Sequence, residues 1–596
     1  MYEKSQSNID LIMRQHLVGM SLSLLVLPFA VKAQHSQKPN VVIFLADDQG
    51  WGDLAFDGNK MVQTPNIDAI AREGVSFENF YVCPVSAPTR AEFLTGRYAY
   101  KGHVTGVSEG RERLDINHLT IADYFKKAGY KTGAFGKWHN GLQYPYHPNA
   151  RGFEEFYGYC SGHWGNYWNP LLDHNGALVK GKGFLTDDLT NHAIDFIKKN
   201  KDKPFFVYIP FNTPHSPMQV TDRWWKPWQG RNLLQQATAK YREVPNHMRA
   251  ALALSENIDW NVGRVTQTLQ QLGLDENTIL VYFSDNGPNS HRWNGNMRGI
   301  KASVEEGGIR SPLFMRWHGH LPPGKNIKQL SACLDLMPTL LGLVGVKVNT
   351  SHLDGIDLTP YIRRNTSENN RSVYRQWGKK SSLHQNKYIL SNDDNLYDLE
   401  IDRSQKYPLN SQYPVVYQAL KEKKEALDKA CYSVVNEKDR RPFLLADPNE
   451  KYSKLPARDG IAKGTIMRSN RFPNSSYFTH WTSPLDEINW HAEICESGYF
   501  EAILYYTCKA ENVGSEIELT CGTSQLTVPL QQANDSPLIG ADLDRIPRQE
   551  SYMQDFKPFH MGTIHLQKGE QTIRLRAPKI LGSNAMDLYM LVFKRK

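Results

Sequence analysis

The sequence of 596 residues has few cysteines, no long Lys/Arg tract, and no hydrophobic run long enough to cross a bilayer comfortably. Its seven cysteines are widely scattered, which excludes a zinc knuckle and a disulfide-rich scaffold, and their odd number leaves at least one thiol free. The net charge of +8 is spread along the chain. This argues against a nucleic-acid-binding protein and leaves an anionic small substrate open.

The N-terminal segment is typical of a secretory signal. Arg14 precedes an apolar run at residues 17–29, and Val31 and Ala33 are small residues at the minus-three and minus-one positions of a cleavage site. We therefore predict a signal peptide over residues 1–33 and an exported protein, periplasmic or secreted in a bacterium, with no membrane span in its mature form. A retained membrane anchor is the alternative.

The first two thirds of the chain alternate strand-like and helix-like patterns. Residues 40–46 form a continuous apolar run, typical of a strand buried on both faces, and similar runs occur at 131–135, 204–209 and 278–284. Helical periodicity occupies 66–73, 119–128 and 248–272. This alternation predicts an α/β fold with a large mixed β-sheet flanked by helices. Ligands of such sheets bind at the carboxyl ends of strands, so polar residues that follow strands are the candidates.

The last part of the chain has a different pattern. Residues 438–460 are polar and contain prolines, which predicts a linker. After it come the strand-like runs 498–506, 515–520, 571–575 and 587–593 with no convincing helix between them, which predicts a β-sandwich that is separable from the rest. The predicted domains are a signal peptide (1–33), a catalytic domain (34–370), a small subdomain (371–437), the linker (438–460) and the sandwich (461–596).

Two cysteines flank a predicted hairpin turn in the sandwich. Cys508 and Cys521 lie on either side of the segment AENVGSE, residues 510–516. A hairpin here would let them face each other across two strands. A disulfide and two buried free thiols are both compatible with this pattern.

Four oxygen-bearing side chains follow two of the predicted strands. Asp47 and Asp48 come after the first strand, and Asp285 and Asn286 come after the strand at 278–284. Carboxylate and amide oxygens suit calcium or magnesium, and the histidines usual in a zinc site are missing. Two unrelated turns are the alternative, because Asp and Asn also favour turns.

Six segments occur in an order and spacing that the sequence shares with a known family. They are LADDQGWGD (45–53), SAPTRAEFLTGR (86–97), GKWH (136–139), NTPHSP (212–217), FSDNGP (283–288) and RGIKASVEEGGIRSP (298–312). By these segments the sequence resembles the sulfatase family of the alkaline-phosphatase superfamily over residues 38–435. The segment LYDLEIDRSQK (396–406) resembles the start of that family's small α+β C-terminal subdomain.

The resemblance distinguishes two candidate nucleophiles, Cys83 and Ser86. The family carries Cys or Ser, any residue, Pro, any residue and Arg, and the series Ser86, Pro88, Arg90 matches this pattern whereas Cys83 does not. The resemblance implies that a maturation enzyme oxidises Ser86 to formylglycine (3-oxoalanine). The two geminal hydroxyls of its hydrate would let one attack sulfur and the other lose a proton to expel sulfate, whereas serine would be left as an inert ester. The alternative is that Ser86 only caps a helix that begins near Pro88.

The resemblance also implies the remaining roles. Arg90 would orient the modified residue, Lys137 and Lys301 would hold the sulfate oxygens, His139 would accept a proton during sulfate release, and His215 would protonate the leaving alcohol. The implied calcium ion would lower the pKa of the nucleophile. Its ligands would be Asp47, Asp48, Ser86, Asp285 and Asn286.

Two loops are candidates for substrate specificity. Residues 161–170 and 289–296 are rich in His, Trp, Tyr and Asn, and the candidate sugar-binding side chains in them are His163, Trp164, His291 and Arg292. Tryptophans that only pack the fold are the alternative.

Together these features predict a secreted, calcium-dependent sulfatase that acts on a sulfated glycan. One alternative is a phosphoester or phosphonate hydrolase of the same superfamily. The other is a non-catalytic glycan-binding protein on a sulfatase scaffold, against which the complete set of expected catalytic residues argues.

Overall fold

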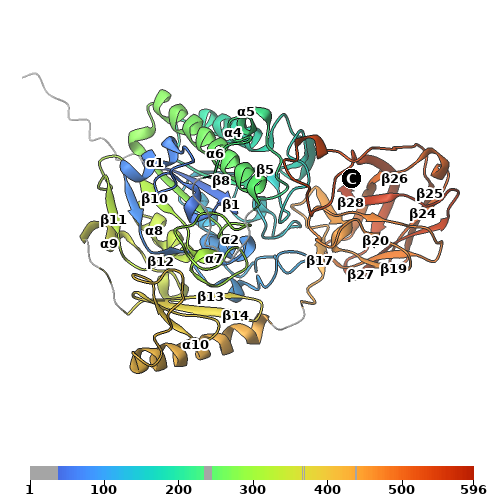
Figure 1. Cartoon of the computed structure of the whole chain (residues 1–596). Coiled ribbons are helices and arrows are strands. Elements are labelled where there is room, and N and C mark those ends of the chain that lie inside the picture. The colour runs from blue at the N-terminus through green and yellow to red at the C-terminus, as the bar shows by residue number, and fades with distance from the viewer. Residues whose placement is uncertain (1–37, 234–243, 365–366, 368–369, 436–438) are drawn as a thin grey trace, which may run out of the picture. The chain divides into compact units, whose positions relative to one another are not determined.

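The computed structural model describes residues 38–233, 244–364, 367, 370–435 and 439–596 (Figure 1). Lys38–Lys596 form one compact unit. The predicted signal peptide, residues 1–33, lies outside the described residues. None of the described helices has the length and apolar character needed to cross a membrane.

The largest element is a mixed sheet of ten strands in the order β11-β2-β10-β9-β1-β8-β4-β5-β6-β7. The strands are β1 (Asn40–Asp47), β2 (Val75–Phe77), β4 (Lys131–Lys137), β5 (Glu155–Tyr159), β6 (Leu171–His174), β7 (Ala177–Lys180), β8 (Phe205–Pro214), β9 (Thr278–Ser284), β10 (Leu313–Arg316) and β11 (Lys325–Ile327). Two short strands outside it, β3 (Phe80–Tyr81) and β12 (Ser331–Ala332), pair with each other.

Strand β1 is the centre of this sheet. It pairs in parallel with β8 on one side and β9 on the other, and all eight of its residues are buried. This explains the continuous apolar run, because both faces of the strand contact helices. The neighbours β9, β1, β8 and β4 are mutually parallel, so their carboxyl ends meet at one edge of the sheet.

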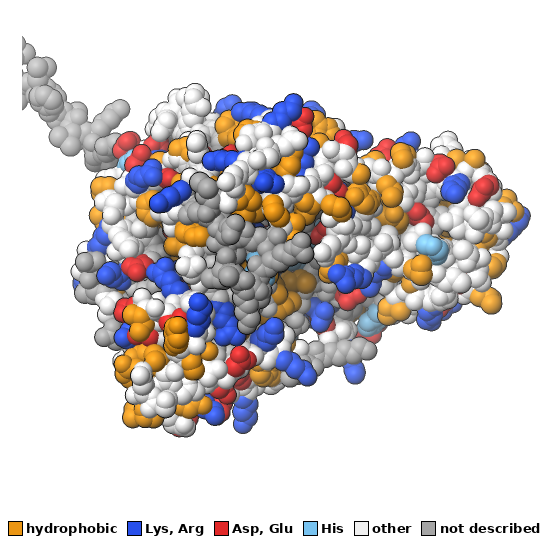
Figure 2. Space-filling model, viewed as in Figure 1, with side chains coloured by type: hydrophobic (Ala, Val, Ile, Leu, Met, Phe, Trp, Pro, Cys, Tyr) orange, Lys and Arg blue, Asp and Glu red, His pale blue; other side chains and the backbone are white. Residues whose placement is uncertain are grey.

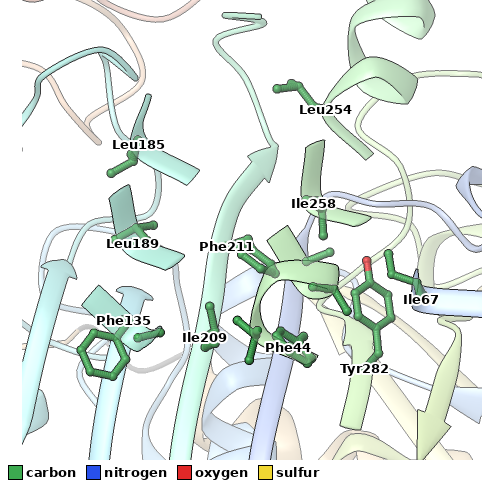
Figure 3. Packing of buried hydrophobic residues seen from close by; sticks show 14 of the residues in the cluster. Phe44, Ile67, Phe135, Leu185, Leu189, Ile209, Phe211, Leu254, Ile258 and Tyr282 are labelled. Carbon is green, nitrogen blue, oxygen red and sulfur yellow. The ribbon is translucent and has the colours of Figure 1, made fainter. Parts of the chain in front are cut away.

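Helices cover both faces of the sheet. They are α1 (Pro65–Arg72), α2 (Ser86–Thr95), α3 (Ile121–Lys127), α4 (Leu185–Lys199), α5 (Asp222–Trp225), α6 (Pro245–Gln271), α7 (Glu306–Ile309), α8 (Leu336–Leu343) and α9 (Thr359–Arg364). Side chains of α1, α4 and α6 pack on one face against Phe44, Phe211 and Tyr282 (Figure 3). Alternate β1 residues, such as Ile43, pack on the other face against α2, α3 and α8.

The remaining strands form a small subdomain and a C-terminal sandwich. The small subdomain is an antiparallel sheet of β13 (Ser372–Trp377), β14 (Lys380–Gln385), β15 (Tyr388–Leu390) and β16 (Leu396–Asp398), packed against α10 (Pro414–Val435).

The C-terminal region is a sandwich of two sheets around one hydrophobic core, drawn in orange and red in Figure 1. Its first sheet contains β17 (Phe443–Leu445), β19 (Ile461–Lys463), β22 (Glu487–Ile494), β24 (Glu516–Cys521), β25 (Ser524–Pro529) and β27 (Gly569–Lys579). Its second sheet contains β18 (Tyr452–Pro456), β20 (Met467–Arg468), β21 (Phe478–Thr479), β23 (Gly498–Thr507), β26 (Lys557–Leu566) and β28 (Asp587–Arg595). The predicted fold class is therefore confirmed. Acidic and basic side chains are interspersed over the face in Figure 2, in keeping with the dispersed net charge.

The structure differs from two of the sequence-based predictions for the C-terminal region. The predicted linker, 438–460, contains two sandwich strands, since β17 pairs with β22 and β18 pairs with β28. Both strands are short and peripheral: β17 (FLL) ends the first sheet, and β18 (YSKLP), with its terminal proline, pairs only with β28 among the described strands. The predicted hairpin between Cys508 and Cys521 is also wrong, because β23 and β24 belong to different sheets. Both cysteines are buried free thiols.

The sandwich shares buried contacts with the catalytic region. Lys454 of β18 forms an ion pair with Asp173 of β6, and both side chains are almost fully buried. Burial opposes ionisation of Asp173, but Lys454 and His147 nevertheless hold the pKa of this carboxyl below its usual range. Trp164 and Leu171 also pack into an apolar cluster with Met553, Tyr589 and other sandwich residues. These contacts argue against the freely separable module that the sequence predicts.

The ion pair between Lys454 and Asp173 gives a direct test of this contact. Lys454→Ala removes the lysine that neutralises the buried Asp173 carboxylate and leaves only the neighbouring His147, so we expect it to lower the free energy of unfolding by about 3–5 kcal/mol. The matched control is Lys463→Ala, whose exposed ion pair with Glu487 should be worth about 0.5 kcal/mol. Denaturant-induced unfolding measures both. Equal, small effects of the two substitutions would contradict a structural contact at β18.

Candidate active site

The residues that the sequence singled out meet at the carboxyl ends of four adjacent parallel strands. Asp47 ends β1 and Asp48 follows it, Lys137 ends β4, His215 follows β8, and Asp285 follows β9. The three carboxylates and Lys137 are at most 1 % exposed. The order β9-β1-β8-β4 explains the cluster, because it places the ends of distant segments side by side.

Each carboxylate has a cationic partner. Lys137 Nζ lies 2.7 Å from Asp47 Oδ2, Lys301 Nζ lies 2.7 Å from Asp48 Oδ1, and Arg90 Nη2 lies 2.7 Å from Asp285 Oδ2. Burial raises the pKa of Asp47 to about 7, with Asp285 and Asp48 adding to the effect and Lys137 opposing it. Three carboxylates at this depth require nearby positive charge to stay ionised.

The cluster has the donors of a site for a hard divalent cation. Asp47, Asp48 and His215 each place a possible ligand atom within 4.8 Å of the others. Asn286 donates its amide N–H to Asp48 Oδ1 at 2.8 Å. The amide oxygen of Asn286 faces Ser86 Oγ, 3.4 Å away. The carboxylate and amide oxygens fit calcium or magnesium.

Ser86 is the first residue of α2, and every residue of this helix is buried. Its Oγ donates a hydrogen bond to Asp47 Oδ1 at 3.1 Å and accepts one from Lys137 Nζ at 3.0 Å. The helix therefore begins at Ser86 rather than near Pro88, and the hydroxyl binds site side chains rather than only capping the helix. The N-terminus of α2 adds partial positive charge where an anion would bind.

The neighbours of Ser86 have different partners. The Cys83 sulfur lies within 4.8 Å of ligand atoms of Glu92 and Cys333 in a separate buried cluster. Arg90 donates to the backbone carbonyl of Lys137 at 2.9 Å as well as to Asp285. Arg90 therefore holds the ends of two strands together beside Ser86.

His139 has a defined tautomer. Its Nε2 lies 2.9 Å from the carbonyl oxygen of Val107, which can only accept, so Nε2 carries the proton. Burial and the nearby charge of Lys137 hold the pKa of His139 well below its usual range, so the ring is neutral. Its Nδ1 is buried and has no hydrogen-bond partner among the described residues. His139 thus presents an unoccupied acceptor.

His215 is oriented in a similar way. Its Nδ1 donates to the carbonyl of Ser216 at 2.6 Å, and its Nε2 lies 3.6 Å from Asp48 Oδ2. Burial, Lys301 and Lys137 lower the pKa of His215 to about 3, although Asp48 opposes this shift. The ring of His163 stacks on His215 with centroids 5.7 Å apart.

Two residues of the site region have left-handed backbone conformations. Asp48, directly after β1, has a φ of 65°, and His139, two residues after the end of β4, has a φ of 61°. Non-glycine residues adopt this region at a cost in free energy, and such strain is concentrated at functional sites.

Sequence patterns missed several residues that support the site. Asn474 donates to the Val107 carbonyl at 3.1 Å, the same oxygen that His139 binds, and its Oδ1 accepts from Gly162 N at 3.2 Å and from Arg458 Nη1 at 2.9 Å. These C-terminal residues are more than 300 positions from His139, and no motif marks them.

The structure places the four candidate sugar-binding residues in different surroundings. Arg292 donates to both oxygens of Asp53, at 2.6 and 2.7 Å, and to the carbonyl of Asp48 at 3.0 Å, and its side chain is 2 % exposed. Its guanidinium is therefore a buried brace for the segment after β1. His163 and Trp164 lie on the loop beside His215, where Trp164 stacks on Tyr159 with centroids 4.9 Å apart. His291 is half-buried next to Arg292.

A protein-family model described as Sulfatase matches residues 39–346, which is more than half of the chain. The chain belongs to the sulfatase family. This confirms the resemblance and the enzyme class, sulfuric ester hydrolase, predicted from the sequence motifs. The matched residues contain the whole cluster from Asp47 to Lys301.

Curated relatives support the same assignment. An N-acetylgalactosamine-6-O-sulfatase of Bacteroides thetaiotaomicron is 30% identical over 498 residues, covering 66% of this chain and 94% of the relative. An N-acetylgalactosamine-6-sulfatase of Mus musculus is 32% identical over 362 residues, covering 54% of this chain and 66% of the relative. The solved structure "Ps i-CgsB in complex with k-i-k-neocarrahexaose" is 28% identical with a TM-score of 0.60, covering 67% of this chain and 98% of that one.

A substitution of Arg292 tests whether this residue is a structural brace or part of a sugar-binding subsite. Arg292→Ala leaves Asp53 buried and unpaired, so we expect a loss of about 3–5 kcal/mol in unfolding free energy. Arg298→Ala, which removes a partly exposed arginine from an ion pair with Asp393, is the stability control and should cost about 0.5 kcal/mol. If Arg292→Ala left the stability unchanged and altered only substrate affinity, the brace would be refuted.

Proposed function

We propose that this protein is an exported sulfatase that hydrolyses sulfate esters of a sulfated carbohydrate, with a calcium ion and a formylglycine formed from Ser86. The observation that carries the proposal is the placement of Ser86 Oγ between Asp47 and Lys137, at the N-terminus of a buried helix in a sulfatase fold. The names of the curated relatives favour a 6-sulfated N-acetylgalactosamine unit as the substrate.

Asp47, Asp48, Asp285, Asn286 and residue 86 would hold the calcium ion. Bound there, the ion would lower the pKa of the nucleophilic hydroxyl and offset the charge of the clustered carboxylates. Formylglycine at position 86, as its hydrate, would supply two hydroxyls on one carbon. A maturation enzyme is therefore a required partner, and a serine-type site calls for one that does not depend on a thiol.

Two lysines would bind and orient the sulfate group. Lys137 is fully buried and touches Ser86, whereas the Lys301 side chain is 18 % exposed and reaches Asp48 from the solvent side. Ammonium groups aimed at sulfate oxygens stabilise the negative charge that develops as the ester bond breaks. Because both cations are held by carboxylates before substrate arrives, little reorganisation is needed.

The two histidines would move protons. His139 presents a free Nδ1 lone pair and would accept a proton from residue 86. His215, whose Nδ1 proton is bound to Ser216, would deliver a proton from Nε2 to the leaving alcohol. Its low pKa in the free protein comes from burial and the lysine charges. A bound sulfate anion would offset those charges and raise this pKa.

The alternative functions have less support. A phosphoester or phosphonate hydrolase is disfavoured by relatives named for sulfate esters. A non-catalytic binder would not need to preserve the buried ion pairs around Ser86 at their full cost in desolvation. Steady-state comparison of a sulfate and a phosphate ester of the same phenol distinguishes the two enzyme classes.

The proposed function makes a direct prediction about residue 86. The active protein should be about two daltons lighter at residue 86 than its gene encodes, a change that mass spectrometry of the tryptic peptide detects. Ser86→Ala should abolish turnover, and Ser86→Cys should restore it in a host whose machinery accepts cysteine. Cys83→Ser is the matched control and should be nearly silent. Full activity with an unmodified Ser86 would refute the mechanism.

Calcium binding has a readout independent of turnover. Calcium should raise the melting temperature of the wild-type protein, because a ligand that binds only the folded state stabilises it. In Asp48→Asn one carboxylate charge of the site is lost, so we expect at least a tenfold weaker apparent affinity, and activity should be lost. The control is Asp393→Asn, an exposed carboxylate of the small subdomain, which should respond to calcium as the wild type does. An equal calcium response in Asp48→Asn would place the ion elsewhere.

A further inference from the structure

A cavity of about 400 Å³ lies between the loop after His163 and three segments of the sandwich region. The loop contributes Trp164, Asn166 and Trp168, and the sandwich region contributes Asp542, Phe556 and Tyr589. Its volume is within the range of small-molecule sites in proteins, roughly 300–1,000 Å³. The residues assigned above to sulfate and calcium do not line it.

We propose that this cavity binds an unsulfated sugar unit of the same glycan whose sulfate occupies the active site. The inference rests on the proposed function and extends it: the substrate is an oligosaccharide or polymer rather than a sulfated monosaccharide, and the sandwich is part of the substrate site.

The chemistry of the cavity is that of a sugar site. Trp168, which is 45 % exposed, offers a ring face on which a sugar can stack, while Trp164, Phe556 and Tyr589 add apolar wall. Asp542, Asp555 and Gln554 supply acceptors and a donor for hydroxyl groups. Two carboxylates with the single lysine Lys180 disfavour a second sulfate, which is why the proposed unit is an unsulfated one.

The cavity and the sulfate site share one loop. His163, whose ring stacks on His215, directly precedes Trp164 of the cavity. Tyr167 of the same loop donates its hydroxyl to the carbonyl of His215 at 2.9 Å. The Cα atoms of His163 and Trp168 are at most about 17 Å apart, since an extended residue spans roughly 3.4 Å. An oligosaccharide of a few units can therefore reach both the sulfate site and the cavity.

Hydrogen bonds join the two walls of the cavity. Gln219 accepts from the backbone of Tyr167 at 2.5 Å and donates to the carbonyl of Gly540 at 2.6 Å. Arg548 donates to the carbonyl of Gly165 at 2.6 Å. The loop and the sandwich segments are thus held together before a ligand binds, which lowers the entropic cost of binding.

The kinetic test compares Trp168→Ala with the wild type on two substrates. On a hexasaccharide that carries 6-sulfated N-acetylgalactosamine, kcat/KM should fall about three- to tenfold, the loss expected for one aromatic stacking contact. On the monosaccharide N-acetylgalactosamine 6-sulfate it should be unchanged. Tyr499→Ala, an exposed aromatic of β23 outside this cavity, is the matched control and should change neither value. Equal effects of Trp168→Ala on both substrates, or none on the hexasaccharide, would overturn the proposal.

A binding measurement separates this proposal from the proposed function. By calorimetry, the desulfated hexasaccharide should bind the wild-type protein and bind Trp168→Ala at least threefold more weakly, whether or not residue 86 has been converted. Absence of binding to the wild type, or equal binding to both proteins, would overturn the cavity proposal alone. Failure of matured wild-type protein to hydrolyse any sulfate ester would overturn the proposed function, and the calorimetry would still decide the cavity.

Discussion

Three carboxylates buried at one edge of the central sheet are the constraint on which the site depends. Asp47, Asp48 and Asp285 cannot remain ionised at this depth without positive charge close by, and Lys137, Lys301 and Arg90 provide it at 2.7 Å. Each cation comes from a different segment: the end of β4, the loop before α7 and the interior of α2. Charge pairing therefore holds together the segments that form the candidate active site.

This pairing also explains how the site is prepared for its substrate. The lysines are held by carboxylates that a divalent cation would share, and Arg90 holds Asp285 while binding the carbonyl at the end of β4. The two histidines have their protons fixed by backbone carbonyls, of Val107 for His139 and of Ser216 for His215. Fixed tautomers leave the second nitrogen of each ring without a backbone partner, so in the proposed function little rearrangement would be needed when an anion binds.

The sandwich is joined to this site rather than attached beside it. Asn474 and Arg458 hold the loop at Ser161 and Gly162, and Asn474 shares the Val107 carbonyl with His139. Ser216, next to His215, donates its hydroxyl to Glu550. The buried pair of Lys454 with Asp173 extends the contact to the edge of the main sheet. The sandwich therefore helps to hold both histidines of the candidate active site in place.

Local sequence determined much of this protein. The apolar run at 40–46 predicted a doubly buried strand, and the polar residues after it and after 278–284 were expected at strand ends. Motif spacing favours Ser86 over Cys83 as the modified residue, because the pattern is carried within five residues of one helix. These features depend on neighbours in the chain, so the sequence contains them directly.

Tertiary structure decided the rest, because it depends on segments hundreds of residues apart. Arg292 lies in a loop with the composition of a sugar site. In the folded protein, however, its guanidinium is buried in an ion pair with Asp53 and serves as a structural brace. The segment 438–460 has the composition of a linker, yet pairing with β22 and β28 makes strands of part of it. Cys508 follows β23 and Cys521 ends β24, and these two strands belong to different sheets although they are close in sequence. In each case the structure depends on a residue or strand that lies far away in the sequence. The free energy of burial and of strand pairing comes from such long-range contacts, which a local sequence pattern does not specify.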